Sequence, residues 1–374
     1  AQFEAVPDQR AALDEATDRA VDALKAHQSF LEDELLPRST GDFRLGRDLF
    51  ERKLRYSLDT DMSAEEVVSA AWELLDQTTA ELAVVAAELH PRMFPGEPLP
   101  EDPAALVRKV LDRIADDHAD DETLLPEARK TLQEATVFVA EHGFVTLPDE
   151  EVSIILMPEF RRGVAIAYCD SPGPFEEQRQ TFYAIAPPPA TWDDKRRESF
   201  YREYNSSMLY ELTVHEAMPG HYLQLAHAGQ FESPVRAVFD IGTFVEGWAL
   251  YSEWMMTEHG FGGLEVRMQR LKMILRLCIN AIVDHEVHTG SMDHDAALAL
   301  MTGRGFQEEG EAEGKWIRAC LTSTQLSTYL VGMLEVMELR REAEAGDTFD
   351  VRTFNDELLA HGSPAPRHLR GLLG

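Results

Sequence analysis

The feature that most restricts the fold is the segment His215-Glu-Ala-Met-Pro-Gly-His221, which places two imidazoles and a carboxylate close together in the chain. Six residues turn an unbroken α-helix through about 600°, which would leave the two imidazoles roughly 120° apart. Pro219 lacks a backbone N–H and its ring opens the preceding turn, while Gly220 accepts backbone angles that other residues avoid. We therefore predict a helix that is broken between Ala217 and His221, so that His221 returns beside His215.

A second carboxylate, Glu246, follows His221 after enough residues for a helix, a turn and the start of another helix. Two histidines and one glutamate form the ligand set of an open zinc site, and Glu216 would project toward water beside the first ligand. Glu253 lies on the same helical face as Glu246, and it either supports a ligand histidine or forms a surface salt bridge. The alternative for the whole segment is an ordinary helix break whose imidazoles are hydrogen-bonded.

The composition restricts the class of protein. The 374 residues include 35 Lys and Arg against 67 Asp and Glu, and the net charge of −32 argues against nucleic acid as a partner. No apolar run is long enough to predict a membrane span. Cys169, Cys278 and Cys320 lie far apart and predict no disulfide framework. The acidity fits either a solvated surface or a field that attracts cationic substrates.

Periodicity predicts a mainly α chain with a small β insertion. Ser63 and Glu66 form a predicted capping box before the second of three amphipathic helical stretches, which cover residues 11–36, 64–89 and 103–142. Short β-type runs bounded by prolines follow at residues 152–157, 163–169 and 181–186. The pattern is helical again from residue 192, with breaks expected near residues 219–220, 260–263, 303–314 and 362–366.

We predict a single catalytic unit over residues 1–374, with two helical lobes around a cleft. Residues 1–148 form an N-terminal helical part, and residues 149–190 hold a small sheet at about 150–187. Residues 191–374 form a C-terminal helical part with the zinc site. Trp248 and Trp254 are expected in the core rather than on a substrate-binding surface.

These motifs resemble a known family. His215-Glu-Ala-Met-Pro-Gly-His-Tyr-Leu-Gln224 and Glu246-Gly-Trp-Ala-Leu-Tyr-Ser-Glu253 are similar to segments of the bacterial "domain of unknown function 885" family. The resemblance is dense over residues 200–365, and it continues in Asp284-His-Glu-Val-His288, Gln325-Leu-Ser-Thr-Tyr-Leu-Val-Gly332 and Glu338-Leu-Arg340. The chain has Lys315-Trp316 where members of the family tend to have Arg-Tyr.

That family resembles the gluzincin metallopeptidases, such as thimet oligopeptidase, carboxypeptidase Taq and angiotensin-converting enzyme, and this implies a mostly helical, two-lobed fold. The resemblance also implies a Zn²⁺ ion on His215, His221 and Glu246, with Glu216 as the catalytic base. It implies that the small sheet lies at the cleft edge, where an extended peptide would pair with it.

Further site residues follow from the C-terminal motifs of the resemblance. Tyr329 and His288 are candidate donors to the oxyanion that develops on a substrate carbonyl. Asp284 lies in the same motif as His288, and it is expected near the substrate or behind a ligand. Arg340 is a candidate for binding a substrate carboxylate, with a surface or structural ion pair as the alternative.

The sequence leaves three functions open. The first is a zinc-dependent metallopeptidase that cleaves peptides with Glu216 as general base, and the second is a zinc enzyme acting on a small amide or another carbonyl compound of specialised metabolism. The third is a helical binding protein with a structural or vestigial metal site, against which Glu216 argues because such a site needs no adjacent base. We expect no nucleic-acid or membrane partner, and the sequence does not indicate an oligomeric state. Because the chain starts at Ala1 without an apolar signal core, we predict a processed or trimmed cytoplasmic protein.

Overall fold

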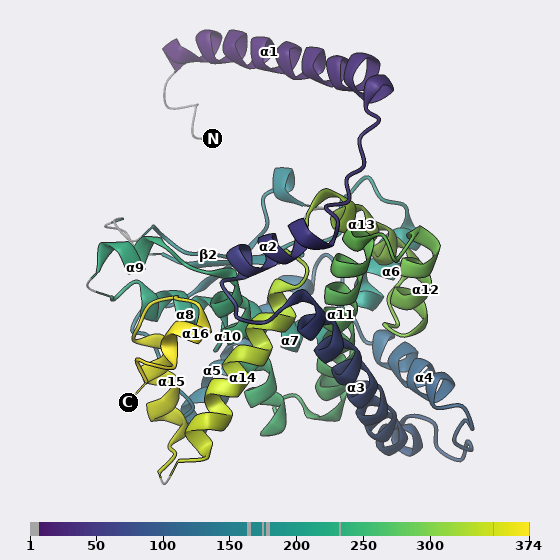
Figure 1. The fold of residues 1–374 in the computed structure, drawn as a ribbon, viewed down its shortest axis with the longest axis vertical. Coiled ribbons are helices and arrows are strands. Elements are labelled where there is room, and N and C mark those ends of the chain that lie inside the picture. Colours follow the sequence, from purple (N-terminus) through teal and green to yellow (C-terminus); the bar gives the residue numbers. More distant parts are fainter. Residues whose placement is uncertain are drawn as a thin grey trace. The chain divides into compact units, whose positions relative to one another are not determined.

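The computed structural model describes residues 7–162, 166–173, 176, 180–231, 233–346 and 348–373. Helices dominate these residues and the strands form one small sheet, which confirms the predicted fold class (Figure 1). The chain divides into two compact units, residues 1–43 and residues 44–374. Where the sequence predicts one unit, the structure thus separates the first 43 residues from the rest of the chain.

The first unit is a long exposed helix. α1 (Pro7–Ser29) continues through a π-helical turn (Phe30–Leu35) and a 3₁₀ turn (Leu36–Arg38), which confirms the helix predicted over residues 11–36. Every described side chain from residue 9 to residue 43 is exposed, including Leu24 at 68%. The described part of this unit therefore has no buried core, and its helix depends on local propensity and on pairs such as Arg19 with Glu15.

Four helices open the second unit, and the predicted capping box stands before the second of them. Ser63 Oγ accepts the N–H of Glu66 at 3.2 Å, and the Glu66 carboxylate accepts the N–H of Ser63 at 2.8 Å. This reciprocal cap starts the longest helix of the unit. The four helices are α2 (Arg47–Leu58), α3 (Ala64–Met93), α4 (Pro103–Ala115) and α5 (Leu124–His142).

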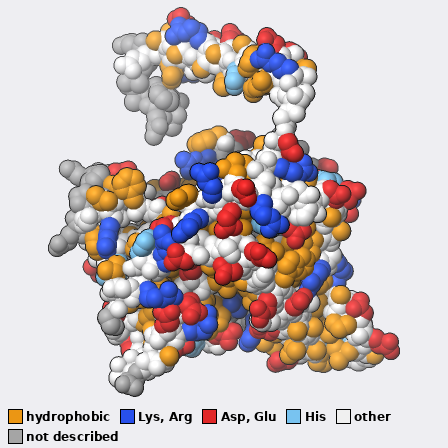
Figure 2. Space-filling view, in the orientation of Figure 1, with side chains coloured by type: hydrophobic (Ala, Val, Ile, Leu, Met, Phe, Trp, Pro, Cys, Tyr) orange, Lys and Arg blue, Asp and Glu red, His pale blue; other side chains and the backbone are white. Residues whose placement is uncertain are grey.

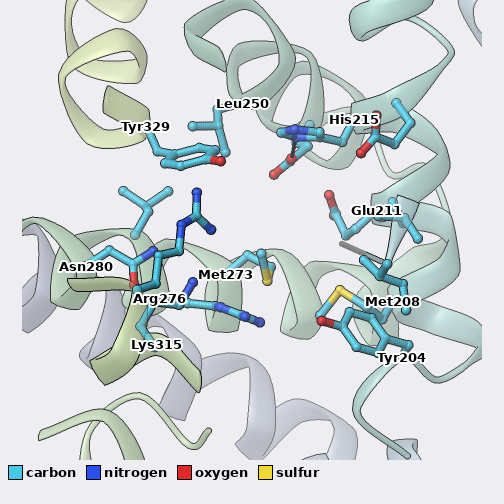
Figure 3. A pocket seen from close by; sticks show the side chains of 16 residues that line it. Tyr204, Met208, Glu211, His215, Leu250, Met273, Arg276, Asn280, Lys315 and Tyr329 are labelled. Carbon is cyan, nitrogen blue, oxygen red and sulfur yellow. Dashed lines mark hydrogen bonds and ion pairs between the residues drawn. The ribbon is translucent and has the colours of Figure 1, made fainter. Parts of the chain in front are cut away.

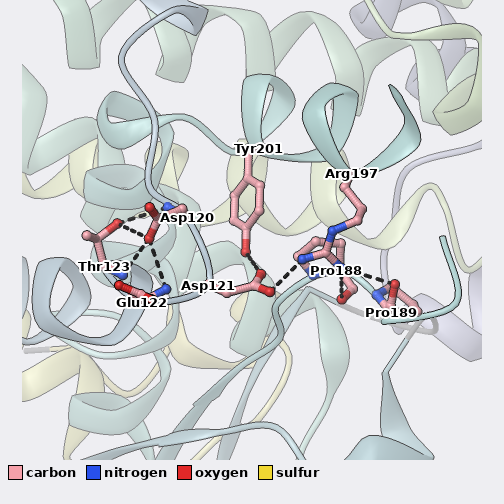
Figure 4. Close-up of polar contacts among 8 residues, drawn as sticks. All are labelled: Asp120, Asp121, Glu122, Thr123, Pro188, Pro189, Arg197 and Tyr201. Carbon is pink, nitrogen blue, oxygen red and sulfur yellow. Dashed lines mark hydrogen bonds and ion pairs between the residues drawn. The ribbon is translucent and has the colours of Figure 1, made fainter. Parts of the chain in front are cut away.

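A polar junction between α4 and α5 interrupts the continuous stretch predicted over residues 103–142 (Figure 4). Asp120 Oδ1 accepts two backbone N–H groups that follow it in the chain, at 2.9 and 2.8 Å, and this forms a tight turn. Asp121 accepts hydrogen bonds from Tyr201 and Arg197 of α6 (Asp194–Glu203), and Arg197 also donates to two proline carbonyls that follow the sheet. The junction therefore joins α5, α6 and the end of the sheet.

The sheet contains three short strands, in the order β1-β3-β2: β1 (Ser153–Leu156), β2 (Ala167–Asp170) and β3 (Phe182–Ile185). β1 runs parallel to β3, with Ile154 opposite Tyr183, and β2 runs antiparallel to β3, with Cys169 opposite Tyr183. The predicted β runs are confirmed, except that residues 163–165 of the second run lie outside the described residues. β2 lies at one edge of the sheet.

The rest of the second unit is helical, and most of the predicted breaks fall between helices. The break at residues 219–220 separates α7 from α8. The break predicted at residues 303–314 is shorter, because the helix after it already includes Gly310 and Gly314. The helices are α7 (Ser206–Glu216), α8 (His221–Ala228), α9 (Pro234–Val238), α10 (Gly242–Glu258), α11 (Gly263–Thr289), α12 (His294–Gly303), α13 (Glu309–Leu321), α14 (Thr328–Glu344), α15 (Val351–Leu359) and α16 (Pro366–Leu369).

Two large hydrophobic cores organise the described residues of the second unit, and each combines helices that are far apart in the sequence. One core joins α2, α3 and α4 to α11, α12 and α13, and the other joins α5, the sheet, α7, α8, α10 and α15. α10 and α14 contribute side chains to both cores and so connect them. As expected, Trp248 is fully buried in the second core and Trp254 packs against it.

α10 and α14 cross through two glycines. A Cβ on Gly247 would lie 2.5 Å from the carbonyl oxygen of Gly332, and a Cβ on Gly332 would lie 2.2 Å from that of Thr243. No side chain fits between the helices at this point, so their backbones are in direct contact. The contact fixes how α10, which carries Glu246, lies against α14, which carries Tyr329.

The surface is charged and mixed. Figure 2 shows acidic and basic side chains intermingled over one face, with apolar side chains exposed among them. On this face the acidic side chains are therefore interspersed with basic ones rather than gathered in one patch. Within the part of the chain that the structure describes, no helix is both long and apolar enough to cross a bilayer.

A buried ion pair links α6 to α11. Lys272 Nζ donates to Glu203 Oε2 at 2.8 Å, and Arg276 lies 3.8 Å from the other oxygen of a carboxylate that is only 6% exposed. Burial alone would raise the pKa of Glu203, but the two cations outweigh it and hold this pKa below its ordinary value. The pair therefore stabilises the fold while Glu203 is ionised.

Glu203→Gln should lower the free energy of unfolding by about 3–5 kcal/mol near neutral pH, because buried Lys272 loses its partner. The pKa of Glu203 is lower in the folded chain than its ordinary value of 4.5, so its contribution is present above that pH and is lost as the pH falls further. Urea unfolding at neutral and acidic pH should show that the difference in the free energy of unfolding between variant and wild type becomes smaller at acidic pH. The exposed Glu198→Gln is the control, expected within about 0.5 kcal/mol of wild type. A difference that does not change with pH contradicts the prediction.

Candidate metal centre

The chain leaves the helical path between α7 and α8. The N–H of Ala217 donates to the carbonyl of Thr213 at 3.0 Å, and the N–H of Gly220 donates to that of Val214 at 2.9 Å. The segment folds back over the last turn of α7, where a Cβ on Gly220 would lie 1.9 Å from the carbonyl oxygen of His215. Glycine is therefore required at this position, and the predicted break is confirmed.

α10 holds this break in place. The indole N–H of fully buried Trp248 donates to the carbonyl of Pro219 at 2.8 Å, and the hydroxyl of Ser252, one turn further along, reaches the same oxygen at 3.4 Å. Glu246 and Glu253 belong to the same helix. The contact that fixes the break therefore also brings these two carboxylates toward it.

The donor atoms of His215, His221 and Glu246 converge. Glu246 Oε2 lies 3.3 Å from His215 Nε2 and 3.6 Å from His221 Nε2, and the three donor atoms lie within 4.8 Å of one another. The imidazole rings are 4.6 Å apart, with their planes at 83°. Bonds of about 2.0–2.2 Å to zinc place neighbouring ligand atoms of a tetrahedron roughly 3.4 Å apart. The three predicted ligands thus lie at the spacing that a metal site needs.

Glu253 braces the first histidine. Its Oε1 lies 2.7 Å from His215 Nδ1 and its carboxylate is 4% exposed, which favours the supporting role over a surface salt bridge. Burial opposes a charge on His215, but Glu246 and Glu253 outweigh it and raise the pKa of His215 well above its usual range. Burial and the neighbouring charge of His215 lower the pKa of His221 to about 4, and its Nδ1 has no hydrogen-bond partner among the described residues.

Glu216 is a buried carboxylate beside the first histidine. Burial, together with the charge of Glu246, raises its pKa to about 7, although the charge of His215 acts in the opposite direction. The backbone N–H of Cys169 hydrogen-bonds to the Glu216 carboxylate. Because Cys169 belongs to β2, the edge strand of the sheet reaches the site through this bond.

A cavity of about 190 Å³ opens beside these residues (Figure 3). His215 and Glu216 line it together with Tyr329 of α14, so the structure brings this predicted donor into the same space as the predicted base. Part of the remaining wall is apolar, and this part includes Met208, Leu212, Leu250, Met273 and Leu277.

The cavity is also lined by charged residues that we did not assign to a site from the sequence, although we named Lys315 as a departure from the family's pattern. Arg276 and Lys315 lie across the cavity from His215 and Glu211 (Figure 3), and Arg318 lines the same wall as Lys315. Helical spacing relates Glu211 to His215 and Lys315 to Arg318, and this is the one signal that could have found them. Only the fold brings α11 and α13 together around one space.

The prediction of His288 as an oxyanion donor is wrong. His288 Nε2 bonds to the carbonyl oxygens of Ala319 and Thr322, at 2.9 and 2.6 Å, and its ring stacks on Phe50. The residue is 2% exposed and is absent from the cavity wall. Its imidazole ties α11 to the end of α13 instead.

Asp284 does not line the cavity and instead holds the segment that precedes α14. Its fully buried carboxylate accepts the N–H groups of Thr324 and Ser327, at 2.9 and 3.1 Å, and the hydroxyl of Ser327 at 2.8 Å. These bonds fix the segment that leads into α14 and therefore the position of Tyr329.

Arg340 has the structural role that we gave as its alternative. It donates to Glu344 at 2.9 Å and to the hydroxyl of Tyr251, and its guanidinium lies 4.9 Å from the ring centre of Trp254. It is 7% exposed and does not line the cavity, so it does not meet a substrate carboxylate there.

Comparison with known proteins establishes the family. A family model described as "Bacterial protein of unknown function (DUF885)" matches residues 1–373. The chain belongs to the DUF885 family. No curated protein matches this DUF885 chain.

Two solved structures are similar to the DUF885 chain. One, from Shewanella oneidensis and described as "a putative lipoprotein of unknown function", is 32% identical with a TM-score of 0.84, and the match covers 98% of this chain and 67% of that one. The other, described as "the putative lipoprotein from Colwellia psychrerythraea", is 22% identical with a TM-score of 0.77, and the match covers 93% of this chain and 59% of that one. A lipoprotein is not a cytoplasmic protein, so the description of these neighbours differs from the location that we predicted for this chain.

Gly220→Ala should destabilise the second unit by roughly 3 kcal/mol or more, because the added Cβ overlaps the backbone of α7. Gly303→Ala is the matched control, since a Cβ at the end of α12 meets nothing within 4 Å. The control should change stability by no more than about 1 kcal/mol. Thermal unfolding followed by circular dichroism compares the two, and equal melting temperatures would show that the break tolerates a side chain.

Proposed function

We propose that this DUF885 protein is a zinc-dependent hydrolase, and most specifically a metallopeptidase of the gluzincin kind. The observation that carries the proposal is the convergence of His215, His221 and Glu246. His215 and buried Glu216 also line one cavity. A structural metal site needs ligands but no adjacent acid, so Glu216 favours an enzyme over a binding protein with a vestigial site.

The residues fit zinc better than a hard cation. Two imidazole nitrogens and one carboxylate oxygen are the donors that zinc accepts in hydrolytic sites, whereas calcium and magnesium take oxygen ligands. The bond from Glu253 to His215 Nδ1 leaves Nε2 directed at Glu246, which is the orientation a ligand histidine needs. Zinc bound by these residues would polarise a substrate carbonyl and lower the pKa of water to about 7.

The chain's own residues then supply the proton transfers. Glu216 is placed to take a proton from the attacking water and to pass it to the departing amine. Tyr329 shares the cavity, and its phenol is the candidate donor to the oxygen that gains charge. The edge strand β2 reaches Glu216 through Cys169, so an extended peptide that pairs with this edge would lie next to the proposed base.

The size of the cavity keeps a second substrate class open. A cavity of about 150 Å³ is enough to hold one benzene molecule, so about 190 Å³ holds one small group rather than a long peptide. A small amide or another carbonyl compound therefore remains the alternative substrate. Hydrolysis of a panel of oligopeptides and small N-acyl amides by the wild type separates the two.

Purified wild type should hold about one zinc ion per chain by elemental analysis after dialysis, because three ligands converge in a buried site. His221→Ala should lose the zinc, while His227→Ala should keep it, since His227 bonds to the Thr146 carbonyl and is outside the cluster. Glu216→Gln should keep the zinc and lose at least about 10²-fold in hydrolysis. The proposal fails if the wild type binds no zinc, or if Glu216→Gln keeps full activity.

Tyr329→Phe should reduce kcat by about 10²- to 10³-fold without changing zinc content, because it removes one donor to the developing charge. Tyr56→Phe is the control, since Tyr56 is 79% exposed on α2 and should leave kcat unchanged. Steady-state kinetics with a cleaved peptide measures both variants. An unchanged kcat in Tyr329→Phe would assign the donor to another group.

A further inference from the structure

One wall of the cavity is cationic. Arg276 of α11 and Lys315 of α13 lie across from the histidine and carboxylates of α7 (Figure 3), and Arg318 lines the cavity from the same helix as Lys315. Three cations around one small space are unexpected in a chain whose net charge is −32. Whether an external anion would be stabilised at this wall depends on how far other residues of the chain already pair with these cations.

The cations are unequally paired. Arg276 forms ion pairs with Glu311 and, at 3.8 Å, with Glu203. Arg318 donates through Nε and one Nη to the neutral amide oxygen of Gln325, at 3.0 and 2.7 Å. Lys315 is 7% exposed, and among the described residues neither a hydrogen bond nor an anionic neighbour acts on its ammonium. Positive charge therefore remains uncompensated on this wall.

An isolated buried ammonium destabilises a protein, because it loses water and gains nothing in return. Burial and the charges of Arg276 and Arg318 lower the pKa of Lys315 well below its usual range, which agrees with the lack of an anionic partner. A group that weakens the fold in this way is typical of a binding site, where function is kept at a cost in stability. The ligand that restores the balance is an anion small enough for the cavity.

We propose that Lys315, with Arg276 and Arg318 beside it, binds a carboxylate of the substrate about one residue away from the bond that is broken; the assignment of that bond rests on the proposed hydrolase function. The spacing follows from the volume, since the cavity of about 190 Å³, which the cations line together with His215 and Glu216, accommodates about one side chain. The apolar residues between the two ends suit the carbon atoms of such a residue. A free C-terminal carboxylate and an acidic side chain are the two possible sources of this anion.

The test measures binding rather than turnover, in Glu216→Gln with zinc in the buffer. Isothermal titration calorimetry compares N-acetyl-Ala-Ala-Ala with a free carboxylate, the same peptide as its C-terminal amide, and N-acetyl-Ala-Ala-Glu amide, whose one carboxylate is a side chain. The carboxylate that Lys315 recognises should improve affinity about ten- to a hundredfold over the uncharged amide. Adding Lys315→Met should abolish this preference, and Lys315→Arg should keep part of it.

Lys195→Met is the matched control, because it removes the same charge from an exposed position on α6 and should keep the full preference. Lys315→Met should also leave the melting temperature unchanged or raise it, because an apolar chain of similar length replaces an unpaired ammonium. A lower melting temperature together with an unchanged preference would make Lys315 a structural residue and overturn the subsite.

The two proposals fail in different ways. Whichever carboxylate peptide binds better identifies the source of the anion, and a preference that depends on Lys315 supports the subsite even if the wild type hydrolyses none of the peptides. That last result would count against the hydrolase function alone. Equal affinity for the three peptides, or no measurable binding of any of them, overturns the subsite even where hydrolysis is observed.

Discussion

The hydrogen bond from the indole of Trp248 to the carbonyl of Pro219 joins the two halves of the candidate site. The carbonyl lies in a buried turn where the helix ladder is interrupted, so loss of this donor would leave a buried polar group poorly satisfied. Trp248 lies between Glu246 and Glu253 on α10, and the bond therefore sets both carboxylates against the histidines. The convergence of the donor atoms depends on how one turn packs on one buried helix, not on a mobile loop.

The cavity separates its charges. Carboxylates gather at the end formed by α7 and α10, and cations gather at the end formed by α11 and α13. Burial and the charge of Glu253 hold the pKa of Glu211 well above its usual range. A divalent cation at the first end and a substrate anion at the second would each reduce an imbalance of charge. The two proposed ligands would therefore carry opposite charges and bind at opposite ends of the same cavity.

Local rules account for what the sequence could predict. Gly220 and its proline neighbour exclude a regular helix, so the break and the return of His221 follow from adjacent residues alone. The directions in which His288 and Tyr329 point do not follow from the sequence, because both residues lie on helices in the C-terminal motifs. Only the packing of those helices turns His288 toward backbone carbonyls and Tyr329 toward the cavity. Lys315 was named only as a departure from the family's pattern, and its place beside Arg276 could not be predicted because Arg276 comes from another helix. The turn between α4 and α5 was missed because acidic residues form it without the glycine or proline that usually marks a turn.

α10 and α14 touch through the backbone at Gly247 and Gly332, so no side chain mediates the spacing between Glu246 and Tyr329. Substitutions in the cavity wall, such as at Leu250, can therefore alter the shape of the space without spreading the two helices. Members of the family could acquire different substrate preferences by changing the wall while the ligand and the phenol stay in register. Under the proposed function, the two glycines would hold the reacting groups in place while the surrounding side chains set the substrate preference, so the two could evolve separately.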